Sequence, residues 1–215
     1  MKCRRNHGYS SLLVSLIGLS SSVRAQCDPV WSALGSGADW EVRDFAVFDE
    51  DGPGPLPPAL FAGGGFGSLA GVDALILARW DGWEASPVGG GLEADLLGIE
   101  SVSAVPAPIG GIPAGLYVGG EIDTAGGQPV DNLARWLAPD WHGVGGGVTR
   151  PGRLVSHVFA AAVFDSDGAG PLPPELFVGG QFQAAGGAPI ESLARWDGSE
   201  WREVGGGIRS STHPS

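Results

Sequence analysis

The stretch FVGGQFQAAGGA (177–188) decides the fold, because the chain contains it in three versions. Two sister copies precede it, FAGGGFGSLAGV (61–72) and YVGGEIDTAGGQ (117–128), at successive offsets of 56 and 60 residues. The same offsets relate three copies of the tripeptide ARW, at 78–80, 134–136 and 194–196. Self-similarity at a nearly fixed period is the sequence signature of a repeat protein. The chain is therefore predicted to be an array of three similar units.

Further motifs recur in the same order. The segment AVFDEDGPGPLPP (46–58) returns as AVFDSDGAGPLPP (162–174), at the combined offset of 116 residues. Another tryptophan follows each ARW and leads to a GGG group; these are Trp83, Trp141 and Trp201. Trp31 with ALGSG (33–37) is an earlier copy of this last piece. Because only the spacers vary in length, each unit is predicted to be one structural module.

One copy of the repeated stretch, at 61–72, resembles a cofactor-binding motif. Gly65, Gly67 and Ala70 match the G-x-G-x-x-A form of a dinucleotide-binding loop. Such a loop occurs once, between a strand and a helix, whereas this stretch occurs three times. The sister copies also replace Gly65 and Gly67 by other residues. The match is therefore interpreted as accidental, and no cofactor-binding residue is predicted.

Each unit is predicted to contain four strands. In the third unit they are the segments 157–164, 175–182, 191–196 and 201–206. The chain has 38 Gly and 17 Pro in 215 residues, and these break every candidate helix within a few residues. Four short strands joined by Gly, Pro and Asp turns are typical of one propeller blade. The sequence therefore predicts an all-β fold of propeller-type repeats.

The unit resembles the kelch-type β-propeller repeat, in which a double glycine follows an apolar strand and aromatic residues lie on the next two strands. The glycines are Gly63-Gly64, Gly119-Gly120 and Gly179-Gly180. The aromatic pairs are Trp80 and Trp83, Trp136 and Trp141, and Trp196 and Trp201. The motifs VGGxFxxAGG and ARWDG also resemble repeats of secreted bacterial proteins. The additional AGG and GGG groups depart from the kelch pattern.

The resemblance implies a propeller region at 26–209, with units at about 31–83, 83–141 and 141–207, and a disordered tail at 210–215. The array then has three four-stranded blades and one leading strand, whereas closed propellers have four to eight blades. An incomplete propeller is therefore predicted. Three explanations stay open: a longer protein, self-association of the open blades, or a stable three-blade wedge.

Residues 1–25 are predicted to be a secretory signal peptide, with a basic start, the apolar run LLVSLIGL (12–19) and a small-residue cleavage site before Gln26. No apolar run reaches the length of a transmembrane helix. The protein is therefore expected outside the cytoplasm, extracellular or periplasmic. Cys27 is then the only cysteine of the mature chain, so no intramolecular disulfide is expected.

Cleavage removes Lys2, Arg4, Arg5 and Arg24, which leaves eight Arg against 24 acidic residues and a formal charge of −16. Such an acidic chain is not expected to bind nucleic acid or an anionic membrane surface. The expected partner is an unidentified protein or glycan, or a second copy of the chain.

Paired acids suggest a weak metal site. Asp49 and Asp51 precede one glycine, and Asp165 and Asp167 precede another, as oxygen ligands do in a Ca²⁺ loop. No closing Glu follows, and the second unit lacks the acids. A hairpin loop in which Asp accepts backbone hydrogen bonds is the favoured interpretation.

No catalytic residues are predicted, because no nucleophile, base or metal-ligand spacing is recognisable. Polar residues specific to one repeat are the better candidates for ligand contacts: Glu121, Asp123, Gln181 and Gln183. Trp40 is added because no other unit has its counterpart. The predicted function is a secreted, non-catalytic module for protein or glycan interaction or an extracellular structural role. The alternative is the propeller part of a secreted carbohydrate-active or metal-dependent enzyme.

Overall fold

The computed structural model describes residues 32–152 and 155–205, and within these ranges it contains strands and turns but no helix. None of the described residues therefore belongs to a helix that could cross a membrane. The predicted signal peptide, Trp31, Cys27 and the predicted disordered tail lie outside the described residues. The compact unit that begins at Leu34 contains all the strands.

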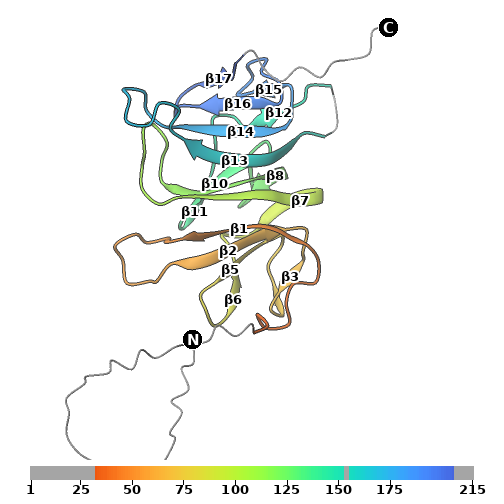
Figure 1. Cartoon of the computed structure of the whole chain (residues 1–215). Coiled ribbons are helices and arrows are strands. Elements are labelled where there is room, and N and C mark those ends of the chain that lie inside the picture. Colours follow the sequence, from red (N-terminus) through yellow and green to blue (C-terminus); the bar gives the residue numbers. More distant parts are fainter. Residues whose placement is uncertain (1–31, 153–154, 206–215) are drawn as a thin grey trace, which may run out of the picture. The chain divides into compact units, whose positions relative to one another are not determined.

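Three antiparallel sheets form the predicted blades (Figure 1). Blade 1 consists of β1 (Val42–Phe48), β2 (Ala59–Gly64), β5 (Leu77–Trp80) and β6 (Ala85–Pro87). Blade 2 consists of β7 (Leu92–Val105), β8 (Gly115–Ala125), β10 (Leu133–Leu137) and β11 (Asp140–Gly143), with β9 (Gln128–Pro129) paired to β8. Blade 3 consists of β13 (His157–Phe164), β14 (Glu175–Gln181), β16 (Leu193–Trp196) and β17 (Trp201–Glu203). The chain is thus an all-β protein of propeller-type repeats, with three four-stranded blades.

Strand register corrects the predicted role of Trp83. Trp136 pairs with Trp141 and Trp196 pairs with Trp201, but Trp80 pairs with Ala85. Trp83 instead lies in the β5–β6 turn, 87% exposed, where its amide donates to Asp81 Oδ1 at 2.8 Å. The second aromatic position of blade 1 is therefore an alanine, and Trp83 is not a strand residue.

The blades pack through their sheet faces. The strands β1, β7 and β13 lie side by side, with the outer strands extending away from them (Figure 1). One hydrophobic cluster joins blades 1 and 2, and includes Phe61, Leu77, Ile99 and Val102. A second joins blades 2 and 3, and includes Tyr117, Leu133, Val158 and Val178. Each internal interface is therefore a continuous apolar core.

The glycine doublet of each repeat serves two separate contacts. A Cβ at Gly63 would lie 2.5 Å from Ile99 Cγ2 and 2.7 Å from Val102 Cγ2, and a Cβ at Gly119 would overlap Val158. The first glycine thus leaves a hole that an apolar side chain of the next blade fills. The second glycine lies against the innermost strand of its own blade, where a Cβ would overlap a backbone carbonyl. A β-bulge in that strand brings the backbone close.

The additional GGG and AGG groups form a backbone latch between consecutive units. Gly91 O accepts a hydrogen bond from Gly126 N at 3.0 Å, and Gly147 O accepts one from Gly186 N at 2.9 Å. Short strands extend the second of these contacts, with β12 (Val148–Thr149) paired to β15 (Ala184–Ala185). The glycines of both groups have positive φ, so their tight turns need a residue without a side chain.

The sequence predicted a leading strand before blade 1, but residues 32–37 form a turn and no strand, and this segment makes the same latch on blade 1. Gly37 N donates to Leu34 O, and Gly37 O accepts from Ala70 N at 2.7 Å. Ala38 bridges Leu69 at the hairpin of β3 (Ser68–Leu69) and β4 (Val72–Asp73). Blade 1 therefore carries a complete latch of its own.

Candidate interaction surface

Blades 1 and 2 each bury one aromatic face beneath the following blade. Phe48 and Phe61 pack edge to face with ring centroids 6.1 Å apart and are 3% and 0% exposed. Tyr117 and Leu133 occupy the corresponding face of blade 2, and both are fully buried. Burial of such side chains stabilises each interface by several kcal/mol, at roughly 25 cal/mol per Å² of apolar area.

Blade 3 carries the same face without a blade over it. Phe164 and Phe177 repeat the edge-to-face pair at 5.8 Å, but Phe164 is 58% exposed. Among the described residues, a Cβ at Gly179 would have only Leu193 Cδ1 nearby, at 3.9 Å, so no described residue fills the hole that neighbouring blades fill elsewhere. Phe164, Phe177, Gly179 and Leu193 are called the trailing face.

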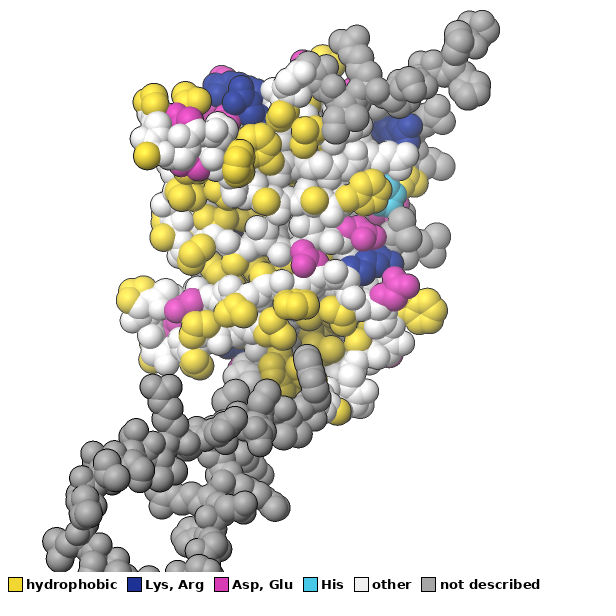
Figure 2. Space-filling view, in the orientation of Figure 1, with side chains coloured by type: hydrophobic (Ala, Val, Ile, Leu, Met, Phe, Trp, Pro, Cys, Tyr) yellow, Lys and Arg dark blue, Asp and Glu magenta, His cyan; other side chains and the backbone are white. Residues whose placement is uncertain are grey.

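Blade 1 exposes the opposite half of the repeated interface. Val42, Phe45, Val47 and Leu60 are called the leading face. In the strand register, Val42 of blade 1 is equivalent to Ile99 of blade 2, and Phe45 is equivalent to Val102. Both of these blade 2 residues are buried. Phe45 is nevertheless 65% exposed and Val47 64% exposed. Figure 2 shows hydrophobic side chains spread over the three blades on the side where β1, β7 and β13 lie, with few Arg side chains among them.

Polar contacts fix the register of the internal interfaces. Val102 N donates to Asp44 Oδ2 at 2.7 Å between blades 1 and 2, and Ala161 N donates to Ser101 Oγ at 3.0 Å between blades 2 and 3. Asp44 and Ser101 are equivalent residues, each paired with the first glycine of its doublet. In each internal interface, one side chain of the preceding blade therefore accepts a hydrogen bond from a backbone amide in the bulged strand of the following blade.

A carboxylate held by arginine also accepts a hydrogen bond from the next blade. Arg79 Nε donates to Glu50 Oε2 at 2.6 Å, and Trp136 Nε1 of blade 2 donates to Glu50 Oε1 at 2.8 Å. The corresponding Trp196 Nε1 is buried and has no acceptor among the described residues, because blade 2 has Ala107 where blade 1 has Glu50. The second interface therefore lacks this bond.

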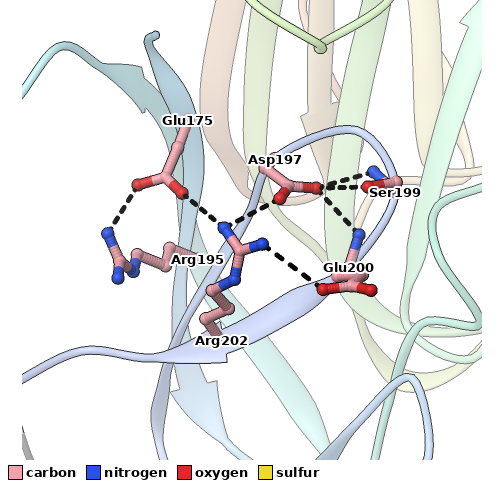
Figure 3. A network of polar contacts seen from close by, with 6 residues as sticks. All are labelled: Glu175, Arg195, Asp197, Ser199, Glu200 and Arg202. Atoms are coloured by element: carbon pink, nitrogen blue, oxygen red, sulfur yellow. Dashed lines mark hydrogen bonds and ion pairs between the residues drawn. The ribbon is translucent and has the colours of Figure 1, made fainter. Parts of the chain in front are cut away.

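The trailing face borders a network of two arginines and three acids, drawn in Figure 3. Arg195 Nη1 contacts Glu175 Oε2 at 2.9 Å, and Arg202 contacts Asp197 at 2.8 Å and Glu175 at 3.8 Å. Arg195 thus pairs with Glu175, and the turn residue Asp197 pairs with Arg202. Hydrogen bonds from Glu200 N and from the hydroxyl and amide of Ser199 lower the pKa of Asp197 to about 2.

The paired acids lie in two hairpin loops of the same conformation. Asp51 Oδ2 accepts from Leu56 N at 3.1 Å, and Asp167 Oδ2 accepts from Leu172 N at 3.0 Å. Asp165 Oδ1 accepts from Gly168 N at 3.0 Å. These contacts are those of the hairpin-loop interpretation. Within the described ranges no group of three His, Cys, Asp or Glu side chains is placed to hold a metal ion, and calcium binding stays a prediction.

The predicted ligand-contact residues lie on three different blades. Trp40, before β1, is 68% exposed, whereas Glu121 on β8 is only 8% exposed. Asp123, Gln181 and Gln183 are exposed. In the described part of the chain, no hydrogen bond or ion pair joins any two of these residues. The sequence predicted open blades but did not single out the residues of the trailing face, because AVF recurs unchanged at 46–48 and 162–164.

Tyr117 offers a direct measure of the closed interface between blades 2 and 3. Burial raises the pKa of its hydroxyl to about 12, and the hydroxyl donates to Pro113 O at 2.9 Å. Because the folded pKa lies above the unfolded value, this group's contribution to stability is intact below about pH 10 and falls as the pH rises toward 12.

We expect the tyrosinate absorbance of the mature chain to appear with a midpoint near pH 12. Tyr9, the other tyrosine, lies in the predicted signal peptide, so Tyr117 alone reports. Denaturant should return the midpoint to about 10, and Tyr117→Phe should abolish the signal. A midpoint near 10 in the folded chain would contradict the closed interface.

Comparison with family models, with curated proteins and with solved structures finds no match for this chain. The fold therefore defines the class: an all-β protein of propeller-type blades, in which no described residue covers the first and last sheet faces.

Proposed function

We propose that the mature chain is a secreted, non-catalytic, kelch-like interaction module that binds a protein through the trailing face. One observation carries the proposal: aromatic positions that are buried in blades 1 and 2 are uncovered in blade 3. Phe48 and Phe61 are both buried, whereas their counterparts in the same edge-to-face arrangement are Phe164, which is 58% exposed, and Phe177, which is half-buried. Contiguous exposed apolar surface marks interaction sites in soluble proteins.

The arrangement of the trailing face favours a protein partner. Aromatic side chains on a sheet face, next to an arginine and acid rim, match the composition of protein interfaces, which have an apolar centre and a polar border. The open space at Gly179 would accept a single apolar side chain, as Gly119 accepts Val158. Secretion is supported by the sequence of residues 1–25.

A photo-cross-linking amino acid in place of Phe164 tests the proposal. Trp83 is the matched control position, because it is more exposed but lies in a turn away from the sheet faces. We expect covalent adducts with protein from position 164 in the culture medium, and few from position 83. Equal yields from both positions, or no adduct from 164, would contradict a binding role for the trailing face.

A further inference from the structure

We infer that the trailing face binds the leading face of a second copy of this chain, head to tail. The inference rests on the proposed function, since it names the partner of the same surface. The two faces are the two halves of an interface that the chain already forms twice internally. Each half is complete at one end of the array and lacks its counterpart.

Shape supports this pairing. In the internal interfaces, Ile99 and Val102 enter the space above Gly63, and Val158 enters the space above Gly119. The leading face presents Val42 and Phe45 at the equivalent register positions. The trailing face presents the equivalent open space at Gly179. The exposed side chains of the leading face thus occupy the positions that fill this space in the internal interfaces, and the trailing face presents the unfilled space.

Polar groups correspond as well. Between blades 1 and 2, the Arg79–Glu50 pair accepts a hydrogen bond from Trp136. On the trailing face, the carboxylate of Glu175 is held by Arg195, the equivalent arginine. Blade 3 has Ser166 where blade 1 has Glu50, so Glu175 supplies its carboxylate from a different position of the trailing face. Trp80 is the half-buried equivalent of Trp136 and pairs with Leu60 of the leading face, which would meet the trailing face of the other copy.

Blade 1 can dock on another copy without receiving a latch from it. A blade in the middle of the array receives its latch from the preceding blade, as blade 2 does through Gly91 and Gly126. Blade 1 already carries the equivalent latch, made by Leu34–Ala38. A second copy therefore needs no latch from residues 206–215 of the first chain.

Closure favours two copies. A head-to-tail contact forms a ring when its rotation closes, and otherwise it continues as a filament. Two copies of a three-blade array give six blades, within the range of about four to eight that closed propellers use. Three copies would give nine. The expected assembly is a dimer with two identical interfaces.

Sedimentation velocity of the mature chain and two variants tests the inference. Phe45→Asp alters only the leading face, and Phe164→Asp alters only the trailing face. Both side chains are more than half exposed, so each variant is expected to keep its fold, and the two monomers are expected to unfold at nearly the same denaturant concentration. We expect a wild-type dimer and two monomeric variants. An equimolar mixture of the variants is expected to regain a dimer, because one wild-type interface then forms between unlike chains.

Two more samples sharpen the test. In blades 1 and 2, the first glycine of the doublet pairs with a residue that has a side-chain acceptor, Asp44 or Ser101. In blade 3, Gly179 pairs with Ala160, so Ala160→Ser supplies a side-chain acceptor at this position. The donor that the introduced hydroxyl would meet, Phe45 N, already donates to Asp44 Oδ1 at 2.8 Å, so this variant is expected to dimerise about as tightly as the wild type. Deletion of residues 206–215 is expected to leave the dimer intact. Added salt is expected to strengthen the dimer, because both copies are acidic.

The outcomes separate the two proposals. A dimer that survives Phe45→Asp but not Phe164→Asp would mean symmetric contact between two trailing faces, and would overturn the inference. A monomeric wild type would overturn it too. If cross-linking from position 164 then captures a different protein, the proposed function stands without self-association. If it captures nothing, both proposals fail.

Discussion

Gly119→Val is expected to destabilise the chain by about 3 kcal/mol, whereas Gly179→Val is expected to change its stability by less than about 1 kcal/mol. The two glycines occupy the same place in consecutive repeats, and each is followed by Gly in the doublet. A Cβ at Gly119 would overlap Val158, which is fully buried between blades 2 and 3. Since neither side chain has room to move, the added methyl groups must separate the blades.

At Gly179 the same substitution meets no neighbouring blade among the described residues. The nearest side-chain atom is Leu193 Cδ1, 3.9 Å from an added Cβ. Valine also suits an extended strand better than glycine does, which offsets part of any cost. Comparing the unfolding free energies of the two variants therefore separates the cost of filling the inter-blade hole from the cost of replacing a glycine within its own blade.

Urea unfolding followed by tryptophan fluorescence measures both changes. The two variants are best made in the Phe164→Asp background, because self-association would otherwise add concentration-dependent stability. Equal losses of stability at the two positions would show that the glycine is needed for its own blade. That result would contradict the assignment of the first glycine to the inter-blade contact.

The blade count was predictable because each strand lies within one repeat. Apolar runs bounded by Gly, Pro and Asp define the strands locally, and the predicted segments of the third unit match β13, β14, β16 and β17 closely. The error at Trp83 came from counting tryptophans without their spacing. Trp141 and Trp201 follow ARW by five residues, and Ala85 occupies that place in blade 1.

The blade count predicted open blades, but which residues lie uncovered on them was not predictable from local sequence, because burial depends on a neighbour in the array. Residues 46–48 and 162–164 are both AVF, yet Phe48 is 3% exposed and Phe164 is 58% exposed. Identical residues thus have opposite environments. The latch was missed for a related reason, since its hydrogen bonds join the end of one unit to the hairpin of the next.

Gly145→Ala is expected to cost about 3 kcal/mol through the latch, against about 1 kcal/mol for Gly205→Ala. Both glycines begin a GGG group and have nearly the same φ, +57° and +61°. Both substitutions therefore carry the same backbone strain. Only Gly145 has a following blade in contact, where an added Cβ would lie 2.5 Å from Trp201 Nε1 and 2.8 Å from Trp196 Nε1.

The additional cost at Gly145 comes from the tryptophans that the methyl group would displace. Trp201 Nε1 donates to Gly145 O at 2.9 Å, so moving the indole ring breaks a hydrogen bond as well as apolar packing. Trp201→Phe is expected to remove the hydrogen bond while keeping an aromatic ring, at a cost of about 1 kcal/mol. In the double variant the costs of Gly145→Ala and Trp201→Phe should not add, because both act on one contact. Strict additivity in urea unfolding would place the two residues in independent contacts, and the GGG group would then be a turn that does not join consecutive blades.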